Sequence, residues 1–144
     1  MELAFAEAIN AEEIGEVPVG AVVVDSSSGE VISVGGNRVE TYHDPSAHAE
    51  LIAIQRASHK LKSPRLINCD LYVTLEPCPM CAQAISFARI RRLYFGSLDM
   101  KGGGVESGAR IFYQSSCNHT PEIYGGFFES RSASMLRNFF RSKR

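Results

Sequence analysis

Metal-binding side chains in two separate short segments limit the folds that this chain can adopt. His48 and Glu50 lie in one segment, and residues 77–81 (Pro-Cys-Pro-Met-Cys) place Cys78 and Cys81 30 and 33 residues after the histidine. Cysteines three positions apart on a helical turn share a face and can bind one ion. A fold that unites the imidazole with both thiolates must therefore bring the starts of two helices to one point.

One imidazole and two thiolates are typical of tetrahedral Zn²⁺. Three protein ligands leave a fourth position for water, as in catalytic zinc sites, whereas structural sites usually have four ligands. Cys69 lies before a strand that leads to Cys78, so we expect it to be a strand length away from the metal. The spacing alone does not exclude Cys117 as a fourth ligand. A redox dithiol is the alternative for Cys-x-x-Cys, but the histidine and its neighbouring acid favour a metal. We predict one Zn²⁺ per chain, held by His48, Cys78 and Cys81 in an open site.

Glu50 lies two positions after His48, and such positions point to nearly opposite sides of a helix. The two side chains can converge if His48 is a capping residue at the helix start. Taken alone, Glu50 is explained by the favourable interaction of a first-turn carboxylate with the helix dipole. Beside a metal site, we predict that Glu50 is the catalytic acid and base.

The hydrophobic pattern predicts a domain of alternating strands and helices. Helical periodicity covers residues 2–14, 48–61, 78–88 and 127–140, and β-branched runs indicate strands at 17–25, 31–34, 71–75 and 93–96. We expect residues 35–37 to break the pattern, and residues 41–47 and most of 99–121 to be loops. The helix at 78–88 joins two strands as a crossover, which favours parallel neighbours. We predict one α/β domain over residues 1–144, with a mixed sheet of four or five strands.

Composition is that of a globular chain, because 144 residues with 44% hydrophobic and 22% charged residues suffice for one core. No apolar run approaches the roughly 18–20 residues of a membrane span, and the acidic start is unlike a secretion signal. We therefore expect a cytoplasmic protein with no membrane partner and with reduced cysteines. Residues 131–144 carry five basic side chains and no acid. Such an end suits a polyanion, although a solvated terminus explains the same charges.

The order His-x-Glu followed by Pro-Cys-x-x-Cys is the signature of zinc-dependent nucleobase deaminases. Further segments resemble the bacterial tRNA-specific adenosine deaminases within the cytidine/deoxycytidylate deaminase superfamily. These segments are residues 16–21, 37–38, 43–50, 71–81, 89–92 and 139–141, with Asp99 and Lys101. The resemblance runs from about residue 2 to the end of the chain. Residues 102–108 (Gly-Gly-Gly-Val-Glu-Ser-Gly) depart from the family pattern.

The resemblance implies a three-layer α/β/α fold of cytidine-deaminase type with a mixed, mostly five-stranded sheet. It also implies a homodimer whose partner subunit helps to shape the RNA site. The implied reaction is the zinc-dependent hydrolytic deamination of adenosine to inosine at the wobble position of a tRNA anticodon. The implied substrate-binding residues are Asn37, Ala49, Glu16, Val17, Pro18, Asp44 and Leu75.

RNA contacts are predicted from charge, aromatic character and the resemblance together. The predicted contacts with the tRNA anticodon stem-loop are Asp99, Lys101, His119, Phe140 and Arg141. Three of the chosen residues have simpler explanations. Asn37 follows two glycines as a turn residue would, Asp44 can cap the turn before a proline, and Phe140 fits the helical stripe of core residues.

Two other functions fit the sequence. One is a deaminase of a free base or nucleoside (guanine, cytosine or cytidine) with the same zinc and glutamate mechanism, which has no need of a basic end. The other is a non-enzymatic, zinc-stabilised RNA-binding module, in which Glu50 is dispensable. A comparison of substrates distinguishes the first alternative from a tRNA adenosine deaminase, and replacement of Glu50 distinguishes the second.

Overall fold

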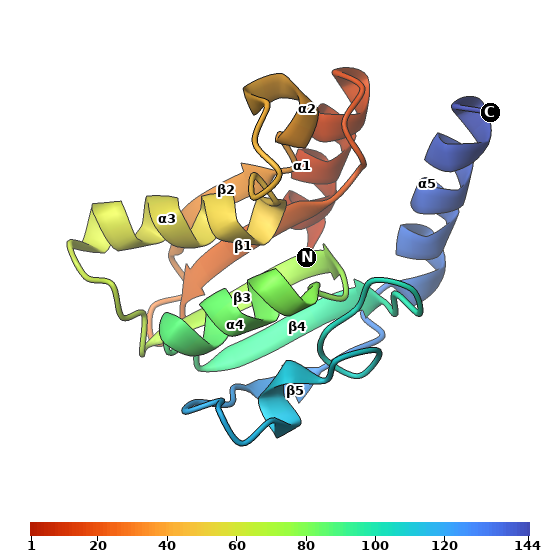
Figure 1. Ribbon diagram of the computed structural model, residues 1–144. Helices are drawn as coiled ribbons and strands as arrows, with labels where there is room; N and C mark the ends of the chain where they lie inside the picture. The colour runs from red at the N-terminus through yellow and green to blue at the C-terminus, as the bar shows by residue number, and fades with distance from the viewer.

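The computed structural model describes residues 1–144, and its centre is a five-stranded mixed sheet in the order β2-β1-β3-β4-β5 (Figure 1). β1 (Gly20–Asp25) pairs antiparallel with β2 (Val31–Gly36) and with β3 (Cys69–Leu75). β4 (Arg92–Ser97) lies parallel to β3 and to β5 (Glu122–Tyr124). The predicted mixed sheet and the parallel crossover are therefore confirmed.

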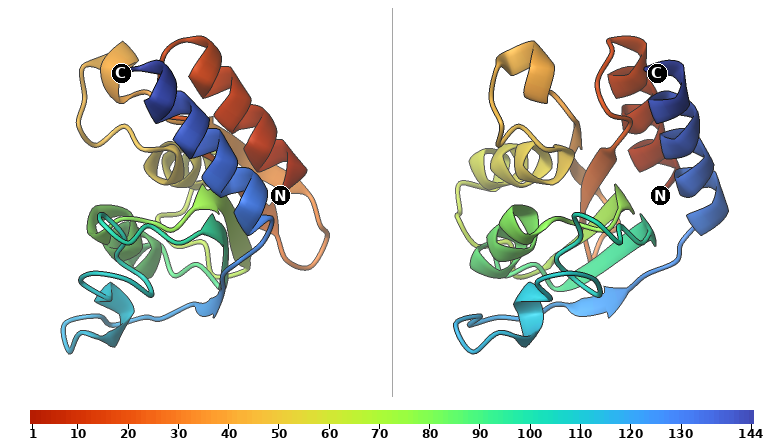
Figure 2. Two further views of the ribbon diagram at one scale, coloured as in Figure 1. Left: turned by 90° about the vertical axis from the view of Figure 1, so that its right-hand side faces the viewer. Right: turned by 45° about the vertical axis from the view of Figure 1, so that its right-hand side comes forward.

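Helices cover both faces of this sheet. α3 (Ala49–Leu61) and α4 (Pro79–Phe87) pack on one face. α1 (Glu2–Glu13) and α5 (Glu129–Ser142) cover the other, where Figure 2 shows them side by side. The predicted three-layer α/β/α fold is confirmed. None of the helices combines the length and the apolar character needed to cross a membrane.

The largest cluster of buried hydrophobic side chains lies between the sheet and the α3–α4 layer. Alternate residues of the central strand β3 and its neighbour β4 point into it, including Leu71 and Val73 of β3 and Phe95 of β4. Ala53 of α3 and Ile85 of α4 meet them from the helices. Because α3 and α4 pack against this core, the first residues of both helices are held in fixed positions at the same end of the strands.

Two local predictions are wrong, and one strand was not located from the sequence. The predicted break at residues 35–37 begins only at Asn37, because Gly35 and Gly36 belong to β2 and pair with β1. A Cβ at Gly35 would lie 2.7 Å from the carbonyl oxygen of Ala49, so the glycine lets α3 approach the sheet closely. Residues 41–47 are not entirely loop, because α2 (Val39–Tyr42) extends into them. The position of the fifth strand, β5, was not predicted, because three residues are too few to give an alternating pattern.

Candidate active site

The two metal-binding segments meet because each stands at the start of a helix. His48 is the N-cap residue of α3 and Cys78 that of α4, and both have extended backbones. Pro79 begins α4, where its missing N–H costs no helical hydrogen bond. Side chains at an N-cap lie beyond the helix end, so His48 and Glu50 reach one cavity although they are two positions apart. The condition under which the two side chains can converge is thus met, because His48 is the capping residue.

The geometry of the three donor atoms fits a tetrahedral ion. The Nδ1 atom of His48 lies 3.6 Å from the Sγ of Cys78 and 3.5 Å from the Sγ of Cys81. All three donor atoms lie within 4.8 Å of one another. A tetrahedral Zn²⁺ with ordinary Zn–S and Zn–N bonds holds nitrogen and sulfur about 3.6 Å apart. His48, Cys78 and Cys81 are therefore positioned to bind one zinc ion without rearrangement.

No fourth metal-binding side chain joins this group. Cys69 is buried at the beginning of β3, whereas Cys78 follows the end of that strand. The Sγ of Cys117 lies 3.4 Å from the Oγ of Ser86 and donates a hydrogen bond of 3.1 Å to the carbonyl oxygen of His119. The chain thus offers three ligands and leaves one coordination position for solvent or substrate, as in catalytic zinc sites.

Proton affinities in the group are strongly shifted. The thiol of Cys81, and then the imidazole of His48, lower the pKa of Cys78 to about 4. The same contact raises the pKa of Cys81. The protonated thiol of Cys81 donates a hydrogen bond to the Cys78 thiolate, so Cys81 holds its proton more tightly. Burial raises the pKa of Glu50, which is 4% exposed, to about 7. A carboxyl group that exchanges its proton near neutral pH suits general acid and base chemistry.

A cavity of about 500 Å³ opens beside the donor group. His48, Cys78 and Glu50 line it, so the metal-binding atoms and the shifted carboxyl group face the same space. Four of the predicted substrate-binding residues also line it: Glu16, Val17, Asn37 and Leu75. This cavity is therefore where a small planar group would meet the catalytic residues.

The other three predicted substrate-binding residues do not line the cavity. Ala49 is completely buried as the first residue of α3, and Pro18 is buried just before β1. The carboxylate of Asp44 accepts hydrogen bonds from the N–H (2.8 Å) and the hydroxyl (2.6 Å) of Ser46. Asp44 therefore caps the turn before α3, which is the alternative to substrate binding given by the sequence.

Several cavity-lining residues were not among the substrate-binding residues predicted from the sequence. They are Gly15, Val19, Val39, Glu40, Glu76, Asp99, Phe139 and Lys143. Phe139 and Lys143 come from α5 at the far end of the chain, and no pattern near the metal-binding segments indicates their approach. Glu76 immediately precedes Pro77 and Cys78, and this position beside the metal-binding segment is the only sequence feature that could have indicated its place in the cavity. Asp99 was predicted as an RNA contact rather than as part of this cavity.

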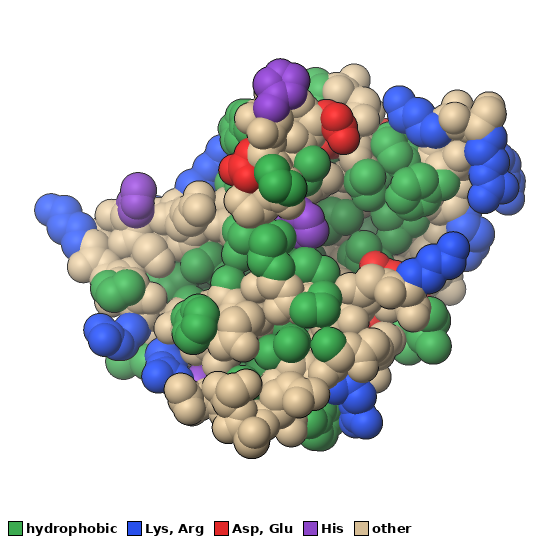
Figure 3. Space-filling view, in the orientation of Figure 1, with side chains coloured by type: hydrophobic (Ala, Val, Ile, Leu, Met, Phe, Trp, Pro, Cys, Tyr) green, Lys and Arg blue, Asp and Glu red, His purple; other side chains and the backbone are tan.

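A second cavity of about 800 Å³ lies next to the first along α5. Asp99, Lys101, Phe140 and Arg141 line it, so four of the five predicted RNA contacts lie together. Basic side chains follow α5 beside a hollow with hydrophobic side chains in Figure 3. Phe140 is 48% exposed, so its explanation as a core residue is wrong, whereas its neighbour Phe139 is buried.

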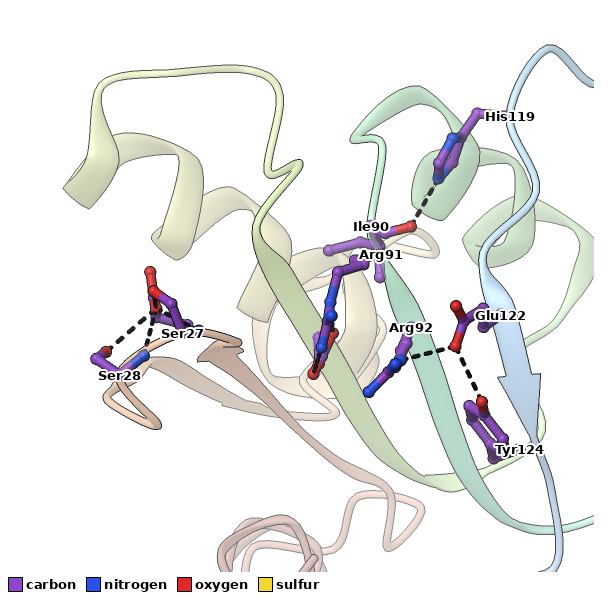
Figure 4. Close-up of polar contacts among 10 residues, drawn as sticks. Ser27, Ser28, Ile90, Arg91, Arg92, His119, Glu122 and Tyr124 are labelled. Carbon is purple, nitrogen blue, oxygen red and sulfur yellow. Dashed lines mark hydrogen bonds and ion pairs between the residues drawn. The ribbon is translucent and has the colours of Figure 1, made fainter.

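His119 lies apart from the other predicted RNA contacts. Its Nε2 atom is 2.7 Å from the carbonyl oxygen of Ile90, just before β4 begins (Figure 4). Because β3 and β4 are parallel, this is the end of the sheet opposite to Cys78. The structure therefore does not bring His119 to either cavity.

Comparisons with known proteins point to one family. The model of the cytidine and deoxycytidylate deaminase zinc-binding region matches residues 1–97. A tRNA-specific adenosine deaminase of Agrobacterium fabrum is 57% identical over 144 residues, which are 100% of this chain and 93% of the relative. A tRNA-specific adenosine deaminase of Rickettsia bellii is 45% identical over 142 residues, 96% of this chain and 98% of the relative. A solved structure from a study of A-to-I editing by tRNA wobble deaminases has a TM-score of 0.91 at 56% identity, covering 94% of this chain and 97% of that one.

Proposed function

This chain belongs to the cytidine and deoxycytidylate deaminase family, and we propose that it deaminates the wobble adenosine of a tRNA anticodon to inosine. The observation that carries the proposal is the open group of His48, Cys78 and Cys81 facing a cavity shared with the buried Glu50. The basic surface of α5 beside that cavity and the full-length similarity to tRNA-specific adenosine deaminases support tRNA as the substrate. A tRNA substrate is consistent with a cytoplasmic location.

Hydrolytic deamination exchanges an exocyclic amine for an oxygen, so one water is consumed and one ammonia is released. A bound Zn²⁺ supplies Lewis acidity, which makes water a strong nucleophile at neutral pH. We assign Glu50 the role of proton carrier. Its carboxylate takes one proton from the attacking water and passes it to the ring nitrogen beside the attacked carbon. It then takes the second proton from the hydroxyl group now on that carbon and gives it to the departing amine, so that ammonia leaves as the carbonyl forms.

The cavity walls are suited to an unstacked base. Val17 and Leu75 offer apolar surfaces, and Asn37 offers a side-chain amide to the base or ribose edge. Ala49 does not line the cavity, but as the first residue of α3 its backbone N–H has no acceptor within the helix; its contact with the base therefore stays a sequence-based proposal. A base must leave its stack to enter such a cavity, which costs less in an anticodon loop than in a duplex.

The second cavity is the proposed contact surface for the rest of the anticodon loop. Its cationic side chains Lys101 and Arg141 suit phosphates, and the exposed ring of Phe140 suits stacking on a flanking base. His119 keeps its predicted RNA contact only as a sequence-based proposal, because it lies at the other end of the sheet.

Removing two charges from the second cavity, Arg141 of α5 and Arg144 just beyond this helix, tests this surface. We expect the double variant Arg141→Gln and Arg144→Gln to raise the KM for an anticodon stem-loop about tenfold and to reduce the salt slope of binding by about two. Turnover of free adenosine, where detectable, is expected to stay at the wild-type level, because no phosphate is involved. Arg65→Gln, which removes an exposed cation from the connection between α3 and β3, is the matched control. Equal losses on stem-loop and nucleoside would remove the RNA-binding role of this surface.

We also propose a homodimer, with the surface around α4 as the contact between subunits. Apolar side chains are exposed there: Met80 and Phe87 on α4, Met100 in the loop after β4, and Tyr113 in the adjacent 3-10 helix Ile111–Tyr113. Contiguous apolar surface of this kind marks interaction sites in soluble proteins.

Sedimentation measurements test the dimer. We expect the wild-type protein to sediment with twice the chain mass, and Phe87→Ser to shift the protein toward monomer, because this ring is 69% exposed in the isolated chain. A wild-type monomer at all accessible concentrations would contradict the proposed assembly.

A comparison of substrates tests the proposed function. The zinc-loaded protein is incubated with an anticodon stem-loop that carries a wobble adenosine, with the same stem-loop carrying its adenosine in the stem, and with guanine or cytosine. We expect inosine and ammonia only from the wobble adenosine. Ammonia from guanine or cytosine alone would favour the free-base deaminase, and stem-loop binding without ammonia would favour the RNA-binding module.

A further inference from the structure

Glu76 is a buried carboxylate on which a single loop converges. Its Oε1 accepts hydrogen bonds from the backbone N–H groups of Val105 (3.2 Å), Glu106 (2.8 Å) and Ser107 (2.8 Å). Its Oε2 accepts from the N–H of Asp99 (2.8 Å) and from the hydroxyl of Ser107 (3.0 Å). The side chain is buried, with Glu76 only 2% exposed. Hydrogen bonds to an ionised acceptor are among the strongest in proteins, so five of them fix the path of residues 99–107.

The glycines of this loop let it lie directly on the start of α4. The N–H of Gly104 donates to the carbonyl oxygen of Pro77 at 2.8 Å. A Cβ at Gly103 would lie 2.6 Å from the carboxyl carbon of Glu76, and one at Gly104 would lie 2.5 Å from the backbone nitrogen of Pro79. The Gly-rich sequence of residues 102–108, which departs from the family pattern, thus permits a close approach to the metal-binding helix.

The loop carries residues that face both cavities. Asp99 lines the first and the second cavity, and Lys101 lines the second. The Oδ1 of Asp99 accepts hydrogen bonds from the N–H groups of Lys101 (3.1 Å) and Gly102 (2.9 Å), so these residues form one turn. The placement of this turn between the cavities therefore depends on the hydrogen bonds to Glu76.

We propose that Glu76 is a positioning residue for substrate binding. It holds residues 99–107 in place, so that Asp99 and Lys101 can contact the nucleotides beside the deaminated base. The inference rests on the proposed function, since it assigns this loop to the flanking part of the RNA. Without Glu76, the loop spends only a fraction of its time in the competent arrangement. Apparent affinity then falls by that fraction, while the chemistry of bound substrate is unchanged.

Two variants and one control test this role. Glu76→Gln keeps the size of the side chain but removes the charge and turns an N–H₂ group toward backbone donors. Ser107→Ala removes one of the five donors and leaves the carboxylate in place. Asp70→Asn is the matched control, because Asp70 is a buried carboxylate at the other end of β3, where it pairs with Arg91 at 3.1 Å. Each protein is assayed for zinc content, thermal midpoint, KM, kcat and the equilibrium Kd for the stem-loop.

Glu76→Gln is expected to raise KM and Kd about tenfold while kcat changes less than about twofold and zinc content stays at one per chain. Ser107→Ala is expected to shift KM and Kd in the same direction by about two- to threefold. Asp70→Asn is expected to lower the thermal midpoint without changing KM.

A purely structural anchor predicts a different result: activity falls with stability alike in Glu76→Gln and Asp70→Asn, with no separation of KM from kcat. That outcome, or an unchanged Kd in Glu76→Gln, overturns the proposal. Should Glu76→Gln fail to fold, an unchanged Kd in Ser107→Ala overturns it. Failure of the wild type to deaminate the stem-loop would overturn the proposed function instead, and the Kd series would still decide the role of Glu76.

Discussion

Glu50→Gln is expected to reduce deamination of the stem-loop by about 10²- to 10⁴-fold, the usual contribution of a general acid and base. The carboxamide is nearly the same size as the carboxyl group, but it cannot accept a proton from water and deliver it to the departing amine. The assay measures inosine formation and ammonia release at saturating substrate. Glu30→Gln, an exposed glutamate paired with Lys60 on a distant surface, is the matched control and keeps wild-type turnover.

Stability and metal content separate this effect from damage to the fold. Burial raises the pKa of Glu50 to about 7, so the folded protein disfavours the charged form at this position. A neutral glutamine meets no such penalty, and the thermal midpoint of Glu50→Gln is expected to equal or exceed that of the wild type. Zinc content is expected to stay at one ion per chain, because Glu50 lies outside the donor group. Wild-type turnover in this variant would contradict the assigned role.

Cys81→Ala is expected to lose zinc and stability together. Cys81 is completely buried, and it supplies one of only three protein ligands. Because the ion binds the folded chain and not the unfolded one, its binding energy is part of the folding free energy. Loss of several kcal/mol corresponds to a fall of about 10 °C or more in the thermal midpoint of a chain of this length. Metal analysis and calorimetry on the same sample measure both quantities.

The remaining cysteines provide the control for this prediction. Cys117→Ala is expected to retain one zinc per chain, because this thiol contacts Ser86 and lies outside the donor group. A chelator is expected to lower the midpoint of the wild type toward that of Cys81→Ala, and to leave Cys81→Ala itself unchanged. Normal zinc occupancy in Cys81→Ala would show that the ligand assignment is wrong.

The metal-binding group could be predicted from the sequence because its chemistry is local. Cys78 and Cys81 are three positions apart at a helix start, and Pro79 marks that start. His48 precedes an amphipathic helix, so its capping position could also be inferred. The alternation of strands and helices then predicts the sheet that brings both helix starts to one edge.

The cavity walls could be predicted only in part, because they depend on packing between distant segments. Phe139 and Lys143 reach the cavity from α5, whose position beside α1 is a property of the assembled layers. The partial exposure of Phe140 likewise follows from how α5 sits on the sheet, which helical periodicity alone does not give. Glu76 is adjacent to the metal-binding segment in the sequence, but its hydrogen-bond donors lie in residues 99–107, a loop whose path the sequence does not specify.

Isotope labelling tests the central claim that this chain hydrolyses an exocyclic amine. The zinc-loaded protein is incubated with the wobble-adenosine stem-loop in ¹⁸O-labelled water, and the product nucleoside is analysed by mass spectrometry. We expect one labelled oxygen in the product for each ammonia released, and Glu50→Gln to release both about 10²- to 10⁴-fold more slowly. An unlabelled product, or an unchanged adenosine after prolonged incubation with zinc-replete protein, would contradict it.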